Sequence, residues 1–190
     1  MKIGILGGTF NPPHLGHLAI ACDVKKDLSL DKIFFIPTNI PPHKEVDLAQ
    51  ASDRLEMLKL MVDGNCSFEV LDIEIKRGEV SYTIDTVRSL RSIYPHDQFY
   101  LIVGSDLAQN FASWKDFEQL KRLVEIVVVQ RKQSVFSAGR PYTIVDIDEI
   151  DISSSKIRTM IRTKKSLNSF LHPGVVSYIK EHKLYRRRQK

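Results

Sequence analysis

The sequence is poor in cysteine and contains no long hydrophobic run. Among its 190 residues only Cys22 and Cys66 are cysteines, and no Cys-x-x-Cys pair or His/Cys cluster with zinc spacing accompanies them. No apolar run approaches the ~20 residues that a membrane-spanning helix requires, and the segment after Met1 lacks the apolar core and cleavage site of a signal peptide. We therefore expect a reduced, cytoplasmic protein with no membrane partner.

Low-complexity segments and internal repeats are also absent. Hydrophobic residues make up 43% of the chain and charged residues 27%, as in ordinary globular proteins. The net charge of +5 favours anionic partners, but part of it lies in a basic tail at 186–190, which we interpret as solvated. No nucleic acid partner is therefore expected. We predict a single domain over 1–190, with a helical C-terminal part from about 153.

Short β-rich runs alternate with helical patterns along the chain. Strands are expected at 2–6, 32–37, 68–75, 99–104, 125–131 and 142–147. Helices are expected at 15–28, 52–62, 84–94, 105–111, 116–123, 154–163 and 173–182. This order predicts an α/β fold: a doubly wound parallel sheet with helices on both faces, whose ligand binds at the carboxyl edge of the strands. The loop near 132–141 is the expected mobile excursion.

The stretch GGTFNPPHLGH, from Gly7 to His17, follows the first expected strand, where a phosphate-binding loop belongs. Neither G-x-x-x-x-G-K-[ST] nor G-x-G-x-x-G is present. Gly7 and Gly8 permit close approach of a ligand to the backbone, and a helix beginning near His14 directs its free N–H groups at an anion. His14 and His17 face the same way, and Gly16 keeps that surface open. A metal pair is less well supported, because no H-E-x-x-H motif is present.

This stretch resembles the (H/T)xGH signature of a nucleotidyltransferase superfamily, and ISSSKIR at 152–158 resembles its C-terminal signature. Further blocks follow in order: IPTNIPPHK at 36–44, SYTIDTV at 81–87, GSD at 104–106 and WK at 114–115. Together they make the chain similar to the bacterial nicotinate-nucleotide adenylyltransferases. The resemblance implies a Rossmann-like fold of the nucleotidyltransferase type. It also implies adenylyl transfer from ATP to nicotinate mononucleotide, giving deamido-NAD and pyrophosphate in NAD biosynthesis.

The resemblance further implies roles for individual residues. The catalytic residues would be His14, His17 and Arg158. The residues that contact ATP or its phosphates would be Gly7, Gly8, Thr9, Phe10, Gly16, Lys44, Gly104, Asp106, Ser153, Ser154 and Ser155. The residues that contact nicotinate mononucleotide would be Asn39, Thr83, Trp114 and Lys115. Mg²⁺ would arrive with ATP, since the sequence has no clustered carboxylates that suggest a cage held by the protein.

In that family the tryptophan stacks on the pyridine ring, while Thr83 and the main-chain N–H of Lys115 would bind its carboxylate. Because that contact uses the backbone, Lys115→Ala is expected to leave acceptor preference nearly intact. Two departures from the family pattern are Asn11 for a common Asp and Ser155 for a common Thr. Both keep the relevant group, a turn-forming amide and a hydroxyl, so neither weakens the interpretation.

Other interpretations of these residues remain open from the sequence. On local grounds the serines at 153–155 or Asp106 could simply cap helices, and Trp114 could be a core residue. Another superfamily member, such as a pantetheine-phosphate adenylyltransferase, shares the first motif. A regulatory nucleotide-binding domain without catalysis and an RNA-binding protein with a basic tail are the alternatives from other classes. The sequence leaves the oligomeric state open, a homo-oligomer included.

Overall fold

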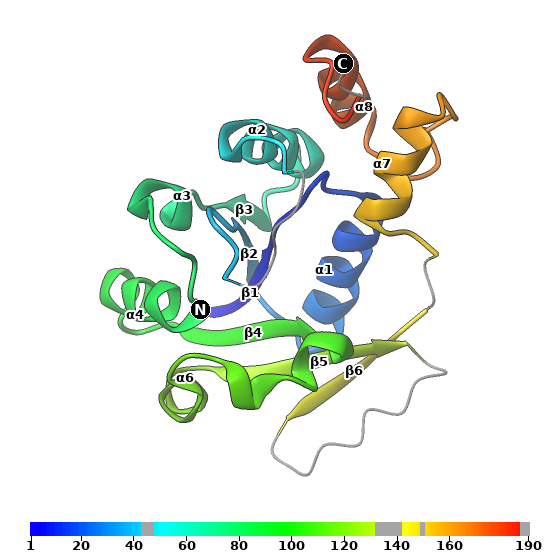
Figure 1. The fold of residues 1–190 in the computed structure, drawn as a ribbon. Helices are drawn as coiled ribbons and strands as arrows, with labels where there is room; N and C mark the ends of the chain where they lie inside the picture. Colours follow the sequence, from blue (N-terminus) through cyan, green and yellow to red (C-terminus); the bar gives the residue numbers. More distant parts are fainter. Residues whose placement is uncertain (43–47, 132–141, 149–150, 187–190) are drawn as a thin grey trace.

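A parallel sheet forms the centre of the molecule (Figure 1). The computed structural model describes residues 1–42, 48–131, 142–148 and 151–186. Within them a six-stranded sheet has the order β3-β2-β1-β4-β5-β6, and every pairing is parallel. The strands are β1 Lys2–Gly8, β2 Lys32–Pro37, β3 Phe68–Val70, β4 Gln98–Gly104, β5 Glu125–Arg131 and β6 Thr143–Ile147. The predicted doubly wound parallel sheet is confirmed.

Helices cover both faces of this sheet, as predicted (Figure 1). They are α1 Leu15–Asp27, α2 Ala51–Val62, α3 Ile73–Arg77, α4 Thr83–Ile93, α5 Ser105–Ala108, the 3₁₀ turn η1 Phe111–Ser113, α6 Phe117–Leu123, α7 Ser154–Arg162 and α8 Pro173–Glu181. Apolar residues of α1, α2, α7 and α8 form one core cluster with the sheet, and those of α4, η1 and α6 form a second cluster on the opposite face.

The apolar strands divide their side chains between these two clusters. In β2, Ile33 and Phe35 belong to the first cluster, while Phe34 and Ile36 belong to the second. This follows from the period of two along a strand, and it explains why strands buried on both faces are apolar throughout. Gly4 of β1 is tightly packed: a Cβ there would lie 2.5 Å from Ile33 Cδ1, so the end of that side chain would have to shift.

The strand order reverses at β1, which pairs with β2 on one side and with β4 on the other. The chain fills one half of the sheet through β2 and β3 and then returns to build the other half from β4. Such a reversal leaves a crevice outside the carboxyl ends of the two central strands. The loops that follow β1 and β4 therefore border the expected ligand site.

The sequence prediction was wrong for the segment at 68–75. Only Phe68–Val70 is a strand, and α3 begins at Ile73 after Asp72. The helix ends at Gly78, which adopts a left-handed conformation (φ 76°) that glycine tolerates without strain. The alternating apolar pattern fits a strand, but its second half is held as a helix because Ile73 packs on the second cluster and Glu74 bonds α4.

Two smaller expectations concern segments that follow β4 and β5. The helix expected at 105–111 is interrupted: α5 ends at Ala108, and the 3₁₀ turn η1 follows. The loop expected near 132–141 lies outside the described residues.

Within the described ranges, no helix combines the length and hydrophobicity needed to cross a bilayer.

Candidate active site

Phe10 anchors the loop after β1 in the first core cluster. Its side chain is 1% exposed, and the residue has a positive φ of 47°. A Cβ on Gly8 would lie 3.3 Å from the Phe10 ring, so the glycine lets the ring fold back under the loop. The buried ring leaves only the main chain of Phe10 for the predicted contact with ATP. Gly7 has open space where a Cβ would stand, and its predicted role stays a prediction.

The two predicted catalytic histidines lie against each other at the start of α1. The His14 and His17 rings stack with centroids 3.7 Å apart, and the Phe10 ring meets His17 edge-on at 4.9 Å. The main-chain N–H of His14 donates to His17 Nδ1 at 3.1 Å. Because Nδ1 accepts this bond, the neutral ring of His17 carries its proton on Nε2. His17 is thereby fixed as a hydrogen-bond donor through Nε2.

Burial keeps both imidazoles uncharged. It lowers the pKa of His14 to about 4. Burial, and then the neighbouring His14, lower the pKa of His17 well below its usual range. His14 Nδ1 is buried and has no hydrogen-bond partner among the described residues. A Cβ on Gly16 would lie 3.0 Å from that nitrogen, so this glycine leaves room for the ring.

Helix α7 brings the second predicted motif to the same loop (Figure 1). Ser153 caps the helix by accepting from the N–H of Lys156 at 3.2 Å. Ser154 Oγ donates to the carbonyl of Pro12 at 2.9 Å, and Arg158 Nη1 donates to the carbonyl of Asn11 at 2.8 Å. Segments more than 140 residues apart are therefore joined where α1 begins.

Ser155 and Arg158 also contact each other on the exposed side of α7. Arg158 Nη2 donates to Ser155 Oγ at 3.3 Å. Of the three serines, Ser153 alone caps the helix. Ser154 donates to the loop after β1, and Ser155 accepts from Arg158. This arrangement leaves other N–H groups of the guanidinium and the N-terminus of α7 available to an anion.

The predicted acceptor residues lie on α4 and on the segment before α6. Thr83 is the first residue of α4. Lys115 Nζ forms an ion pair with Asp85 Oδ2 at 2.9 Å and lies 4.6 Å from the centre of the Tyr82 ring. Arg88 of α4 donates to Asp85 at 3.2 Å. These contacts hold the segment that contains Lys115 against the N-terminal end of α4.

Arg88 reinforces the same junction from the other side. Its guanidinium donates to Asp116 Oδ2 at 3.0 Å and also to Gln119 Oε1. We call the contacts of Lys115, Asp85, Arg88, Asp116 and Gln119 the α4–α6 clamp. The structure thus brings the elements that carry Thr83 and Lys115 together, as the predicted binding of one carboxylate requires.

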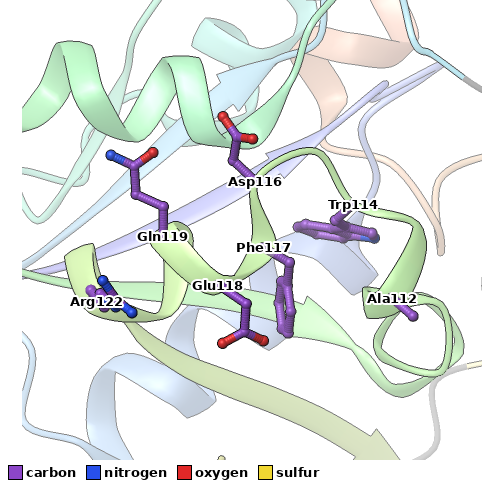
Figure 2. A pocket seen from close by; sticks show the side chains of 7 residues that line it. All are labelled: Ala112, Trp114, Asp116, Phe117, Glu118, Gln119 and Arg122. Carbon is purple, nitrogen blue, oxygen red and sulfur yellow. The ribbon is translucent and has the colours of Figure 1, made fainter.

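Trp114 is half-buried next to this clamp. Its ring meets Phe111 edge-on at 5.2 Å, and Phe111 stacks on Phe117 at 4.6 Å. Figure 2 shows Trp114 beside Phe117 at one end of a surface depression of about 600 Å³. The depression is lined by Ala112, Trp114, Asp116, Phe117, Glu118, Gln119 and Arg122. None of the histidines borders it, so it is not the centre of the candidate site.

Four predicted residues remain, and they lie in other parts of the chain. Asn39 follows β2; its N–H donates to Ser81 Oγ at 3.0 Å and its side-chain amide to the carbonyl of Glu79 at 3.2 Å. Gly104 ends β4, and the exposed Asp106 lies in the first turn of α5 without being its cap. Lys44 lies outside the described residues.

Sequence reasoning missed two buried charged residues close to these loops. Glu74 accepts from Thr86 Oγ1 at 2.7 Å, and burial raises the pKa of its carboxyl. Arg54 of α2 is 1% exposed and bonds the loops after β1 and β2. The sequence gives only a weak signal for Arg54: a charged residue stands next to the apolar stripe of a predicted helix. Such residues are usually solvated.

Comparisons with known proteins give a consistent result. The cytidylyltransferase-like family model matches residues 5–160. A protein of Listeria monocytogenes serotype 4a, named "probable nicotinate-nucleotide adenylyltransferase", is 44% identical over 187 residues, which cover 97% of each chain. A protein of the same name from Oceanobacillus iheyensis is 40% identical over 184 residues, covering 97% of this chain and 96% of the relative.

Solved structures resemble the fold as well. The nicotinic acid mononucleotide adenylyltransferase of Plasmodium falciparum, in complex with NaAD, superimposes with a TM-score of 0.80 at 21% identity and covers 97% of both chains. Its complex with APC gives a TM-score of 0.78 at the same identity. At this level of identity the likeness concerns the fold alone.

Proposed function

The chain belongs to the cytidylyltransferase-like family and, within it, to the nicotinate-nucleotide adenylyltransferases, and from this premise we propose how its residues catalyse the reaction. The enzyme transfers the adenylyl group of ATP to nicotinate mononucleotide, which gives deamido-NAD and pyrophosphate and is a step of NAD biosynthesis. The observation that carries the proposal is the meeting of the histidine pair of α1 with the N-terminal turn of α7, through Ser154 and Arg158.

The reaction needs charge stabilisation and positioning more than proton abstraction. The 5′-phosphate of the acceptor is largely dianionic at neutral pH, because its second pKa is about 6. It attacks the α-phosphorus of ATP in line with the departing pyrophosphate, so the bond to the new oxygen forms as the bond to the β-phosphate oxygen breaks. No general base is required. The protein has to hold both nucleotides in line and stabilise the charge that develops on the transferred group.

His17 supplies a fixed hydrogen-bond donor for that charge. Its Nδ1 is occupied by the His14 N–H, so Nε2–H is the group that donates to an α-phosphate oxygen. His14 stacks on it and holds the ring in place. A neutral donor in a buried site requires little reorganisation during the reaction.

Arg158 and the first turn of α7 bind the phosphates that leave as pyrophosphate. Two of the five guanidinium N–H groups donate to Asn11 and Ser155, and the remaining ones, which have no acceptor among the residues that the structure describes, can donate to phosphate oxygens. On the acceptor side, Trp114 stacks on the pyridine ring, while Thr83 and the main-chain N–H of Lys115 donate to its carboxylate.

Mg²⁺ enters the proposed reaction as part of the ATP substrate. The described ranges contain no group of three or more His, Cys, Asp or Glu side chains arranged to hold a metal ion. Mg²⁺ commonly keeps its waters and bridges substrate phosphates. We therefore assign it no ligand in this chain and derive no step from a cation held by the protein.

The test is incubation of the purified protein with ATP, Mg²⁺ and one acceptor at a time, followed by mass analysis of the products. The acceptors are nicotinate mononucleotide, nicotinamide mononucleotide and 4′-phosphopantetheine. We expect deamido-NAD and pyrophosphate in equal amounts with the first acceptor. No dinucleotide from nicotinate mononucleotide, or a faster reaction with phosphopantetheine, would contradict the proposal.

A further inference from the structure

Arg54 is a buried cation that the proposed chemistry does not use. It lies in the first turn of α2, and only 1% of its surface is exposed. Burial of a guanidinium is costly unless its donors are satisfied. Its donors make four hydrogen bonds, and every acceptor is a main-chain carbonyl.

These carbonyls belong to three different segments of the chain. Nη1 donates to Thr9, in the loop after β1, at 2.8 Å and to Thr38, after β2, at 2.6 Å. Nη2 donates to Asn39 at 3.2 Å, and Nε donates to Ala49, just before α2, at 3.1 Å. Thr9 belongs to the loop proposed for ATP, and Asn39 to the loop proposed for the acceptor. One side chain therefore joins the loops that serve the two substrates.

The bonds also set the orientation of the peptide groups in these loops. In a trans peptide the N–H points away from the carbonyl of the same unit. Thr9 presents its carbonyl to Arg54, so the N–H of Phe10 is directed to the opposite side of the loop. The Asn39 residue is held at both ends, because its N–H donates to Ser81 Oγ at 3.0 Å.

The charge of Arg54 is compensated by carbonyl dipoles. Among the residues that the structure describes, no carboxylate forms an ion pair with it. The buried Glu74 carboxyl interacts with this charge only at longer range, so the carbonyls of the loops are the groups that contact the guanidinium.

We infer that Arg54 is a positioning residue, which fixes the loop after β1 relative to the loop after β2 and so sets the alignment of ATP with its acceptor. This inference rests on the proposed function. Arginine is required because its planar fork reaches four carbonyls at once, whereas lysine has three donors on a single atom. A lysine keeps the positive charge but cannot reach the four carbonyls. Arg54→Lys therefore distinguishes an effect of the charge from an effect of the hydrogen bonds.

The experiment compares Arg54→Lys and Arg54→Met with Met57→Ala. Met57 is also fully buried in α2, but its side chain belongs to the apolar core, so this variant loses stability without a bond to the loops. Steady-state kcat and KM for ATP and for nicotinate mononucleotide are measured well below the Tm of every variant. Hydrogen exchange is followed in the segments 8–11 and 38–40.

We expect Arg54→Lys and Arg54→Met to lower kcat/KM for both substrates by about tenfold or more, the scale of a small misplacement of reacting groups. Exchange should accelerate in both segments. Met57→Ala should lower Tm at least as much, with kcat/KM within about twofold of wild type and unchanged exchange in the loops.

Wild-type kcat/KM in Arg54→Lys, or equal losses in Met57→Ala at equal loss of Tm, would overturn the inference. Faster exchange in only one of the two segments would also overturn it, because the residue would then not couple them. An inactive wild-type protein would contradict the proposed function instead, and the exchange measurement would still decide whether Arg54 holds the two loops.

Discussion

Burial keeps the histidines at the start of α1 neutral, and this determines what they would contribute to the proposed reaction. A charged imidazole would attract the triphosphate in the ground state as well as in the transition state. A neutral donor whose tautomer is set by His14 N–H gains most when charge develops on the transferred phosphate. In the proposed reaction the lowered pKa values are therefore part of the chemistry as well as a consequence of packing.

Stability should depend on pH through His14. The pKa of the unfolded residue is near 6.5, and burial lowers it to about 4 in the folded protein. Between these pH values the unfolded state binds more protons than the folded state. The contribution of His14 to the unfolding free energy is therefore fully present above pH 6.5 and is lost as the pH falls toward 4. Relative to His14→Gln, the wild type should lose about 2 kcal/mol of unfolding free energy between pH 7.5 and 5.

Urea unfolding at a series of pH values measures this difference. His96→Gln is the matched control, because it makes the same substitution at an exposed histidine. If His14→Gln and the wild type lost the same unfolding free energy between pH 7.5 and 5, the conclusion that His14 is buried in its neutral form would be wrong.

Removal of His17 should affect the chemical step more than binding. His17→Ala deletes the Nε2–H donor, and loss of one preorganised donor typically lowers kcat by about 10² to 10³. The affinity for ATP should change much less, because the interaction strengthens only in the transition state. Rapid-quench measurement of the chemical step, with ATP affinity from calorimetry, tests this; a variant with near wild-type kcat would remove His17 from the catalytic residues.

The residues proposed for the chemistry stand in recognisable sequence motifs, whereas the buried residues that hold the loops do not. His14 and His17 are three residues apart, so one turn of α1 is enough to bring their rings together, and Arg158 stands close to the serines of a second local motif. The meeting of the two motifs depends on the tertiary fold. Arg54 and Glu74 depend on burial between segments that are distant in the chain. No local pattern reports such burial, because the same residues on a solvated face would look identical in sequence.

The α4–α6 clamp changes an expectation that the sequence alone suggested. A backbone contact with Lys115 implies that truncation of its side chain is harmless. The structure instead anchors Lys115 Nζ on Asp85, and this bond lowers the pKa of the Asp85 carboxyl. Lys115→Ala would remove one of the bonds that hold the segment containing Trp114 and Lys115, the two residues of this segment proposed to bind the acceptor.

We therefore expect Lys115→Ala to reduce kcat/KM for nicotinate mononucleotide by about tenfold, as for misplacement of a binding group, with the KM for ATP unchanged. Its preference for the acid over the amide acceptor should fall. Lys121→Ala is the control, because it removes a similar cation from the surface of α6, where Lys121 pairs with Glu118. Equal behaviour of the two variants with both acceptors would mean that the clamp has no role in recognition.

The joining of α7 to the loop after β1 should require the planar group of Arg158. Arg158→Lys keeps the positive charge, but a single ammonium group cannot reproduce both the bond to Asn11 and the bond to Ser155. We expect both adenylyl transfer and its reversal by pyrophosphate to slow by about tenfold or more, the lower range for a lost transition-state contact. Lys156→Ala, which removes a surface ion pair with Asp151, should leave both rates unchanged; undisturbed pyrophosphorolysis in Arg158→Lys would assign the arginine to structure.

The elements themselves show where sequence patterns lose information. The long apolar strands were predicted within about two residues, because burial on both faces leaves an unmistakable apolar run. The segment from Phe68 to Ile75 was misread beyond Val70. Its alternation of apolar and acidic residues is compatible with a strand, and only the contacts of Glu74 and Ile73 with α4 and the second cluster decide for a helix.

In the whole molecule, the C-terminal helices share a core with the sheet. Tyr178 of α8 donates to Asp53 of α2 at 3.0 Å, and the N–H of Leu15 donates to the carbonyl of Phe170 at 3.0 Å. Ile179 of α8 is 2% exposed and belongs to the same cluster as residues of β1, β2 and β5. We propose on this basis that residues 1–190 form one domain, which unfolds in a single transition.

The two faces of the sheet allow a direct test of that cooperativity. Trp114, the only tryptophan, packs against the second cluster, whereas Ile179 lies in the first. Ile179→Ala should destabilise the protein by about 2–5 kcal/mol, as for other buried isoleucines. If the chain is one domain, the urea midpoint from Trp114 fluorescence should fall together with the midpoint from far-UV circular dichroism, although the substitution is on the opposite face. Ser177→Ala, on the exposed side of α8, should leave both midpoints unchanged. A dichroism transition that moves while the fluorescence transition stays would divide the molecule into two folding units, because the sheet would then fail to transmit the loss of packing from one face to the other.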